Sequence, residues 1–368
     1  MSIRQMFPGS IVKPGFNPLA AQTTTTVYSL YGWGWNSDGQ LATSNTTSYS
    51  SPKSVGSATT WLKLAAGQYY GSALKSDGTL WTWGNVPAVT SSPVQIGTAT
   101  NWLKIASGQY HNLLISTSGS LWAWGGNANG QLGLGNTTTY SSPKQVGSLT
   151  TWASASGGFY HSLAIKTDGT LWSWGYNNAG QLGSGTVVAR SSPVQVGALT
   201  NWAKVFGANF FTVAIKTNGT LWAWGANDSG QLGLNNRTYY SSPVQIGALT
   251  TWLTVACAYS VLATQTDGTL WGWGGNGYGQ LGLGNIQAKS SPNQVGSLTN
   301  WSKITMASNS GAAIKTDGTL WTWGRNHKGQ LGLGNLTSYS SPKQVGSLTT
   351  WLEISGGGGQ DFMNAIAG

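Results

Sequence analysis

The residues that could carry out acid–base, nucleophilic or metal chemistry are few and scattered. The 368-residue chain has 8 acidic residues, 3 histidines and 1 cysteine. His111 and His161 occupy equivalent places in a repeated segment, but no carboxylate or thiol accompanies them as a further metal ligand. Cys257 aligns with Gly67 and Gly158, which predicts a small packed side chain and no nucleophile. The sequence therefore predicts a protein that is not an enzyme, with no metal site and no cofactor.

Half of the acidic residues belong to one recurring turn. Asp77, Asp168, Asp267 and Asp317 each precede a glycine between two apolar runs. Asp-Gly pairs tolerate the positive φ angles of tight hairpins, so these carboxylates are predicted to build turns and not to act on a substrate.

The elements that would position any site come from an internal repeat of about fifty residues. Three markers each occur seven times: an LWxWG motif, a Ser-Ser-Pro segment, and a lone Trp after a small polar run. The LWxWG motif opens at Leu30, Leu80, Leu121, Leu171, Leu221, Leu270 and Leu320, with Tyr31 replacing its first Trp. The step from Leu80 to Leu121 is the short one, by about nine residues, and the missing residues fall at 85–90.

Each copy is expected to form four short strands, a to d, with strand a as at 61–65 and strands b, c and d as at 161–166, 170–175 and 192–197. A small sheet of this kind cannot bury both faces alone, so such sheets pack face to face around an axis as a propeller. The repeated part of the chain begins with a c strand at 27–34 and ends with a and b strands at 352–355 and 362–367. The two ends are therefore predicted to share the seventh blade and close the ring.

The segment from Gly158 to Gly183, GFYHSLAIKTDGTLWSWGYNNAGQLG, resembles the repeat of the regulator-of-chromosome-condensation (RCC1) family. The resemblance covers residues 26–368 and implies an all-β, seven-bladed propeller of RCC1-like repeats, in a phage, viral or bacterial member of the family. Because the family includes exchange factors, chromatin binders and protein inhibitors, the resemblance does not choose a function. Residues 1–25 lie outside the repeat and are predicted to form an extended arm.

Charge and hydropathy restrict the partners. The net charge is +10, but lysines recur at repeat-equivalent positions and spread around the ring, which argues against a nucleic-acid partner. The chain has no run of 18 apolar residues, so no membrane insertion is expected. Prolines at 8, 14 and 18 interrupt the N-terminus, and no standard signal peptide is predicted.

One face of the ring is predicted to bind a partner. In a four-stranded meander the a–b and c–d connections emerge on one face, and the b–c and d–a connections emerge on the other. The second face carries nearly identical segments, whereas the a–b connections vary and five of the seven centre on an aromatic residue. Such loops on a rigid ring favour recognition of a protein or glycan; the alternative is that the aromatics fill the central channel and the loops have drifted. The predicted binding residues are Tyr69, Tyr70, Tyr110, His111, Phe159, Tyr160, His161, Phe210, Phe211 and Tyr259.

The N-terminal stretch PGSIVKPGFNPL is similar to short N-terminal segments of phage virion proteins, and this similarity implies an anchor. The favoured hypothesis is a virion decoration or tail-appendage protein, located on a virion or extracellular surface. Its partners would be other virion proteins, or a protein or glycan of the host surface. Two alternatives stay open: a bacterial surface or secreted binding module, including an inhibitor, and an intracellular chromatin or exchange-factor relative. The predicted anchor residues are Phe7, Pro8, Ile11, Val12, Pro14, Phe16 and Pro18.

Overall fold

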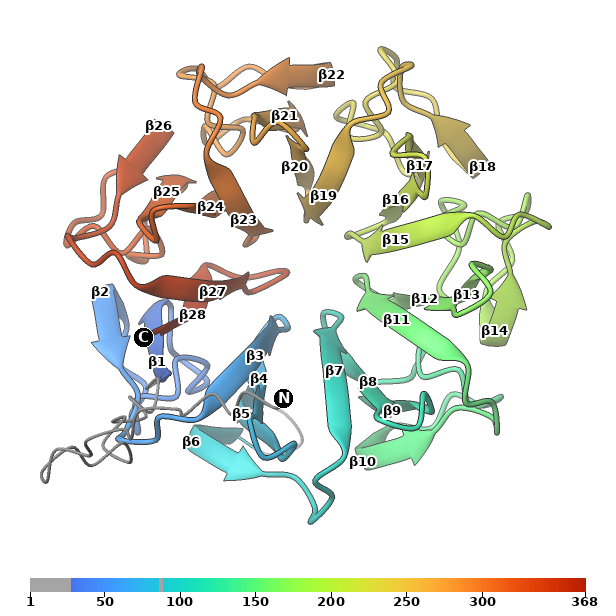
Figure 1. Ribbon diagram of the computed structural model, residues 1–368, viewed down its shortest axis with the longest axis horizontal. Coiled ribbons are helices and arrows are strands. Elements are labelled where there is room, and N and C mark those ends of the chain that lie inside the picture. Colours follow the sequence, from blue (N-terminus) through green and yellow to red (C-terminus); the bar gives the residue numbers. More distant parts are fainter. Residues whose placement is uncertain (1–27, 86–88) are drawn as a thin grey trace, which may run out of the picture.

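The structure, a computed structural model, describes residues 28–85 and 89–368. These residues form 28 strands in seven four-stranded antiparallel sheets around a central axis, and they include no helix (Figure 1). The all-β, seven-bladed propeller predicted from the repeat is therefore confirmed. The predicted arm and all seven predicted anchor residues lie outside the described residues, so both stay predictions. The described part of the chain also lacks any helix that is long and apolar enough to cross a membrane.

Strands a and b form the inner half of each blade. Strands a line the axis and are β3 (Trp61–Ala66), β7 (Trp102–Ser107), β11 (Trp152–Gly157), β15 (Trp202–Gly207), β19 (Trp252–Cys257), β23 (Trp301–Met306) and β27 (Trp351–Gly356). Strands b are β4 (Tyr70–Lys75), β8 (His111–Ser116), β12 (His161–Lys166), β16 (Phe211–Lys216), β20 (Ser260–Gln265), β24 (Ser310–Lys315) and β28 (Phe362–Ala367). Neighbouring blades cover both sides of each b strand, which is why most of its polar residues are buried; Lys75 and Lys166, at the ends of β4 and β12, are half-buried.

Strands c and d form the outer half. Strands c are β1 (Ser29–Gly34), β5 (Leu80–Asn85), β9 (Leu121–Gly125), β13 (Leu171–Gly175), β17 (Leu221–Gly225), β21 (Leu270–Gly274) and β25 (Leu320–Gly324). Strands d are β2 (Tyr49–Ser54), β6 (Val89–Gln95), β10 (Tyr140–Gln145), β14 (Arg190–Gln195), β18 (Tyr240–Gln245), β22 (Lys289–Gln294) and β26 (Tyr339–Gln344). The closing sheet has the order β2-β1-β28-β27, so the two ends of the chain share one blade as predicted.

The tryptophans of each repeat form the blade core. In the blade β11–β14, the lone Trp152 lies edge-on to both strand-c tryptophans, with ring centroids 6.1 Å from Trp172 and 6.4 Å from Trp174. Trp174 is fully buried and Trp172 is half-buried. Edge-to-face pairs of this kind add to the stabilisation that comes from burying the large rings. The repeated tryptophans therefore build the blades.

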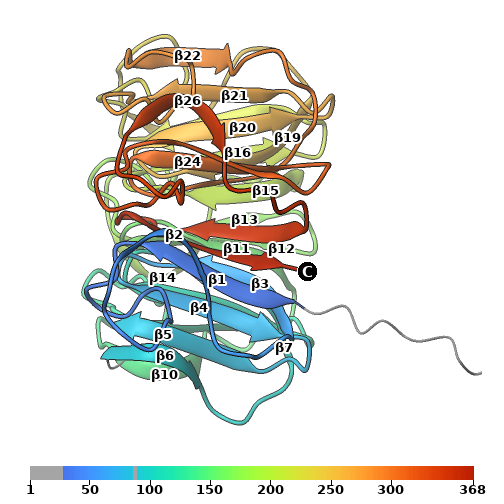
Figure 2. The ribbon, with the colours of Figure 1, turned by 90° about the vertical axis from the view of Figure 1, so that its left-hand side faces the viewer.

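Two faces of the ring follow from this topology, and we name them by their connections. The turn face carries the b–c and d–a connections, and the loop face carries the a–b and c–d connections. Both chain ends of the propeller lie on the turn face: Ser29 pairs with Ala367 at the ends of β1 and β28, and Tyr28 bridges to Thr60 in a d–a connection (Figure 2).

The Asp-Gly segments on the turn face build hairpins, as the sequence predicts. In the blade β11–β14, Asp168 Oδ1 accepts hydrogen bonds from the amide of Thr170 at 2.9 Å and from its hydroxyl at 2.7 Å. The Thr170 hydroxyl in turn accepts from Trp172 Nε1 at 2.9 Å. Gly169 has a φ of 79°, which glycine adopts without strain. These bonds hold the pKa of Asp168 below its usual value, the side-chain bond from Thr170 most of all.

Candidate binding face

Four consecutive a–b loops place aromatic side chains in one continuous group on the loop face. The ring of Tyr110 stacks against that of Tyr160, with centroids 5.7 Å apart. It also lies tilted to the ring of Tyr69, with centroids 6.5 Å apart. Phe159 stacks 5.1 Å from Phe210, and Tyr160 lies 6.2 Å from a c–d loop residue, Tyr176. We call this half-buried group the aromatic arc: Tyr69, Tyr110, Phe159, Tyr160, Tyr176 and Phe210.

Backbone hydrogen bonds between neighbouring loops hold the arc in place. The amide of Gln68 donates to the Gln109 carbonyl at 2.9 Å, and the amide of Gln109 donates to the Gly158 carbonyl at 3.1 Å. The amide of Phe159 continues the series to Ala208, also at 3.1 Å. Burial, followed by the neighbouring Tyr160 and Tyr69, raises the pKa of Tyr110 to about 12. The arc is therefore pre-organised, and Tyr110 stays uncharged at neutral pH.

Four of the ten predicted binding residues are not on the surface. Tyr70, His111, His161 and Phe211 are each the first residue of a b strand, and their exposed fractions are 0–1%. The backbone alternates sides at this point, so the residue before each of them faces outward while these four point into the blade. Burial removes them from the surface that a partner could contact, and the candidate face retains Tyr69, Tyr110, Phe159, Tyr160, Phe210 and Tyr259.

The two buried histidines are partners of hydroxyl groups in the next blade. His111 Nε2 lies 2.7 Å from Ser162 Oγ, and His161 Nε2 lies 3.1 Å from Thr212 Oγ1. Burial lowers the pKa of each imidazole to about 3, so both are neutral at physiological pH. Over residues 28–85 and 89–368, no three His, Cys, Asp or Glu side chains come together where they could hold a metal ion.

The central channel is largely separate from the arc. It has a volume of about 340 Å³ and is lined by strands a, with Phe159 the arc residue that reaches its wall. The alternative in which the loop aromatics fill the channel therefore does not hold for Tyr69, Tyr110, Tyr160 and Phe210, which lie outside the lining.

Cys257 also lines the channel, and its alignment needs correction. The amide of Gly158 bonds to the residue three places later, whereas the amide of Ala258 bonds to the residue two places later, so the a–b loop after β19 is one residue shorter. Ala258 therefore takes the glycine position, and Cys257 ends β19. A Cβ on Gly158 would lie 2.1 Å from His161 Cε1, which explains the small residues there. Burial raises the pKa of Cys257 to about 12, so it stays a thiol.

The c–d loops form the outer part of the loop face, and buried amide side chains hold them. Asn177 Oδ1 accepts from the Leu182 amide at 2.9 Å, and its Nδ2 donates to the carbonyls of Thr186 and Val188 at 2.9 and 3.0 Å. Equivalent bonds recur at Asn36, Asn127, Asn227, Asn276 and Asn326. One asparagine thus fixes both ends of each loop.

A backbone carbonyl in each of these loops also joins neighbouring blades. It accepts from the buried indole Nε1 of the next strand c at 2.9–3.0 Å, in the pairs Trp33–Gln330, Trp83–Gln40, Trp174–Gln131, Trp224–Gln181, Trp273–Gln231 and Trp323–Gln280. The exception is Trp124, whose Nε1 is buried and has no partner among residues 28–85 and 89–368. Its neighbour is the short blade, in which Asn85 pairs with Val89.

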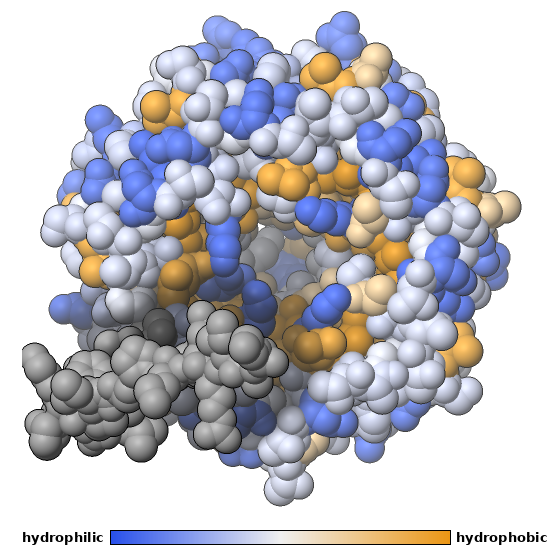
Figure 3. Space-filling model, viewed as in Figure 1, coloured by the Kyte–Doolittle hydropathy of each residue, from blue (hydrophilic) through white to orange (hydrophobic). Residues whose placement is uncertain are grey.

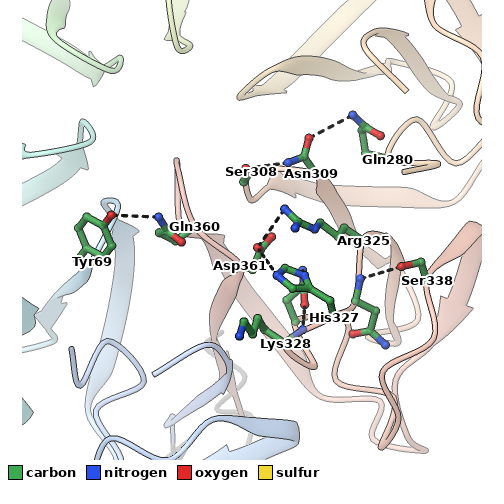
Figure 4. Close-up of polar contacts among 12 residues, drawn as sticks. Tyr69, Gln280, Ser308, Asn309, Arg325, His327, Lys328, Ser338, Gln360 and Asp361 are labelled. Carbon is green, nitrogen blue, oxygen red and sulfur yellow. Dashed lines mark hydrogen bonds and ion pairs between the residues drawn. The ribbon is translucent and has the colours of Figure 1, made fainter. Parts of the chain in front are cut away.

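A charged group occupies the loop face where the ring closes (Figure 4). Asp361, at the end of the last a–b loop, is 4% exposed, and its Oδ2 lies 3.7 Å from Arg325 and 3.6 Å from His327. Burial raises the pKa of Asp361, and the Arg325 and His327 charges oppose that rise. Lys328 adds a further cation and lies 5.0 Å from the ring centroid of Trp35. We call these residues, Arg325, His327, Lys328 and Asp361, the charged corner.

Lysines at equivalent positions of the repeat make contacts within and between the blades. Lys166 lies 3.7 Å from the centroid of Trp172, and Lys75, Lys216 and Lys315 lie at 3.6–3.8 Å from the equivalent rings. Lys104 and Lys204 each donate at 2.6 Å to a backbone carbonyl of the next blade. Much of the positive charge is therefore spread over repeated structural contacts, in agreement with the sequence argument against a nucleic-acid stripe.

The repeat chemistry agrees with a comparison to family models. The model described as the RCC1-like domain matches residues 90–363, and the RCC1 repeat model matches residues 29–74. The chain belongs to the RCC1-like domain family. No curated protein has a matching sequence.

Solved structures show the same fold in distant relatives of this RCC1-like chain. Prp20p of Saccharomyces cerevisiae is 18% identical with a TM-score of 0.84, over 94% of this chain and 92% of that one, and was described with its binding to Gsp1p and histones. Human WBSCR16 is 19% identical with a TM-score of 0.81, over 92% and 98%. The same yeast RCC1 bound to Kap60 is 16% identical with a TM-score of 0.83, over 100% and 96%. At these identities the likeness extends to the fold alone.

Sequence reasoning missed two groups on the loop face. Tyr176 and Tyr278 lie in c–d loops, and these segments vary between copies as the a–b loops do, so the same comparison could have found them. The charged corner gave a weaker signal: Asp361 stands where Tyr110 and Tyr160 stand in other blades, but its two basic neighbours, Arg325 and His327, come from the c–d loop that follows β25.

Proposed function

We propose that this RCC1-like propeller is a non-enzymatic recognition protein that binds a macromolecular partner through the aromatic arc. The observation that carries the proposal is the continuity of the arc, in which side chains from four blades touch one another on one face. Aromatic rings supply large contact area with little loss of side-chain entropy, and they are enriched among residues that dominate binding energy.

The turn face is the alternative surface for partner binding, and its exposed hydrophobic residues support that role less strongly than the arc does. Figure 3 shows hydrophobic side chains around the central opening on this face. Exposed leucines follow the lone Trp of strand a, with Leu62 at 47% and Leu103 at 51%, and others such as Leu249 recur in d–a connections. Because they recur at equivalent positions in several blades, they follow from the repeat, whereas the arc occurs on one side of the ring only.

The test is a triple substitution, Tyr110→Ala, Tyr160→Ala and Phe210→Ala. Once a partner has been cross-linked to the intact protein and identified, its affinity should fall at least about 100-fold in this variant. A matched control replaces the turn-face Leu149, Leu199 and Leu249 with alanine and should bind normally. Unchanged partner binding by a triple variant that has merely lost thermal stability would overturn the proposal.

We further propose that residues 1–25 anchor the protein to an assembled surface, with a virion as the first candidate. The position of Ser29 supports this idea, because the chain enters the propeller on the turn face, opposite the arc. Anchoring from that side would present the arc outward. An exchange-factor role has no observation of its own here, since similarity below 20% identity extends to fold alone.

Deletion of residues 1–25 tests the anchor in the organism that makes the protein. We expect the truncated chain to fold with an unchanged unfolding temperature and to disappear from purified particles, while it still binds the partner of the arc. Retention in particles would contradict a virion anchor. Secretion of the free propeller in the absence of particles would favour the bacterial binding module.

A further inference from the structure

A pocket opens on the loop face beyond the end of the arc, between the blades β15–β18 and β19–β22. Its volume is about 360 Å³, and its lining comes from both a–b loops and both c–d loops of these blades, with Asn309 from the next blade. Phe210 belongs both to the arc and to this lining. The size is at the lower end of the range for small-ligand pockets, about 300–1,000 Å³.

Four aromatic residues line the pocket: Phe210, Phe211, Tyr259 and Tyr278. Phe211 is buried beneath the others, so the rings of Phe210, Tyr259 and Tyr278 are the ones open to a ligand. Tyr259 is 43% exposed and Tyr278 is 45% exposed, which is unusual for such large side chains. The guanidinium of Arg325 lies 4.8 Å from the ring centroid of Tyr278 and supports it from the charged corner. Exposed rings held in this way can pack against an apolar face of a ligand ring, where its C–H groups point outward.

Five amide side chains also line the pocket, and two of them have unused hydrogen-bonding capacity. Asn276, Gln280 and Asn309 are hydrogen-bonded to neighbouring groups. Gln231 Oε1 accepts from the Ser229 amide at 2.8 Å, while its Nε2 makes no hydrogen bond within residues 28–85 and 89–368. Asn209 is 5% exposed, and its Nδ2 has no partner among the same residues. Amides both donate and accept, and so can a ligand hydroxyl group.

One carboxylate lies at the pocket, and no cationic side chain contributes to the lining. Asp228 accepts a hydrogen bond from the hydroxyl of Tyr239, and it is the acidic residue of the lining. A carboxylate accepts hydrogen bonds and cannot donate them. A phosphate or carboxylate ligand would therefore meet repulsion here, whereas hydroxyl groups would find an acceptor.

We propose that this pocket binds a neutral saccharide unit, so that the partner recognised by the arc is a glycan or bears one. The inference rests on the proposed function and specifies its ligand. A sugar ring has an apolar C–H face for Tyr259, Tyr278 and Phe210, and it has hydroxyl groups for Asp228 and the amides. An apolar peptide side chain could use the rings, but it would leave Asn209 Nδ2 and Gln231 Nε2 without partners.

The test uses the full chain and a panel of neutral oligosaccharides that end in glucose, galactose, mannose or N-acetylglucosamine. Saturation-transfer NMR and calorimetry should detect one terminal sugar at about millimolar affinity. We expect Tyr278→Ala to weaken that binding at least about tenfold, and Asp228→Asn to weaken it about fivefold. Leu249→Ala on the turn face is the matched control and should bind the sugar as the parent does.

Three results would overturn the saccharide assignment. The first is the absence of binding by every panel member. The second is a bound sugar whose affinity is the same in Tyr278→Ala and Tyr259→Ala as in the parent. The third is that these variants weaken capture of a protein partner equally before and after enzymatic deglycosylation, which would mean that the pocket binds peptide. A double variant of the arc, Tyr110→Ala with Tyr160→Ala, reports separately on the proposed function, because neither residue lines this pocket.

Discussion

The two faces of the ring are built from the same repeat, but they differ in how their copies vary. On the turn face, the bonds among Asp168, Thr170 and Trp172 recur with the same donor and acceptor atoms at Asp77, Asp267 and Asp317. On the loop face, the position of Tyr160 holds Tyr, Phe, Asn or Asp in other blades, and one c–d loop is shortened. The turn face is therefore fixed by blade construction, whereas the loop face is free to carry a site.

The freedom of the loop face is confined to its outermost residues. Just beneath the arc, His161 and His111 occupy the same position as Phe211 and Tyr70, and all four fill the space over a glycine or alanine. The c–d loops vary in sequence but keep the asparagine that fixes both loop ends. Binding chemistry can thus change between blades while the layer below keeps its packing.

The largest effect we expect is the loss of unfolding free energy on acidification, because the histidines beneath the loop face respond at a higher pH than the aspartates of the turn face. The folded-state pKa of His111 and His161 is lowered to about 3, so the unfolded chain binds more protons below pH 6.5 and stability falls as pH falls. At pH 5 each histidine costs about 2 kcal/mol, and the pair about 4 kcal/mol. The turn-face aspartates have lowered pKa values, so their contribution is present above about pH 3.8 and is lost only below it.

The measurement is the urea unfolding free energy between pH 7 and pH 4 for the parent and for His111→Phe with His161→Phe. Phe211 and Phe362 fill the equivalent positions, so the fold accepts phenylalanine there. The double variant should lose most of the slope above pH 4. An equally steep slope in the variant would place the acid sensitivity elsewhere.

A tryptophan comparison tests how a shortened loop is tolerated. Trp83→Phe removes a hydrogen bond and leaves the Gln40 carbonyl without its indole donor, whereas Trp124→Phe removes an N–H that has no partner. Both changes delete the same atoms from fully buried sites. We expect Trp83→Phe to be more destabilising by about 1–3 kcal/mol in urea unfolding. Equal destabilisation would show that Trp124 has gained another acceptor, such as a bound water.

The repeat made most of the architecture predictable, because the same sequence pattern recurs in every blade. The seven sheets, the shared blade and the Asp-Gly turns all follow from markers in phase. The ten binding residues were harder to predict from the repeat. The side chain of His161 points inward and that of Tyr160 points outward because the b strand begins at His161; a shift of one residue in the predicted strand start would reverse both orientations.

The charged corner and the pocket beside Tyr259 and Tyr278 were harder still to predict. Asp361 meets Arg325 and His327 only because the last a–b loop lies beside the c–d loop that follows β25, and the pocket joins loops of different blades. Spacing within one repeat contains no signal for contacts between blades. Comparison of the copies identifies variable positions, but the ring closure decides which of them meet.

The smallest expected effect concerns the lysines of the turn face, and the chain supplies its own controls. Lys166 Nζ lies 3.7 Å from the centroid of Trp172, and the equivalent residue is Gln265 in a later blade. Lys166→Gln should therefore fold normally and destabilise by about 0.5–1 kcal/mol, the value of an accessible cation–π contact. Thermal unfolding at low and high salt measures this loss. Because the proposed partner site lies on the loop face, the variant should keep full affinity; a weakened affinity would mean that the turn face contributes to recognition and would remove the distinction between the faces.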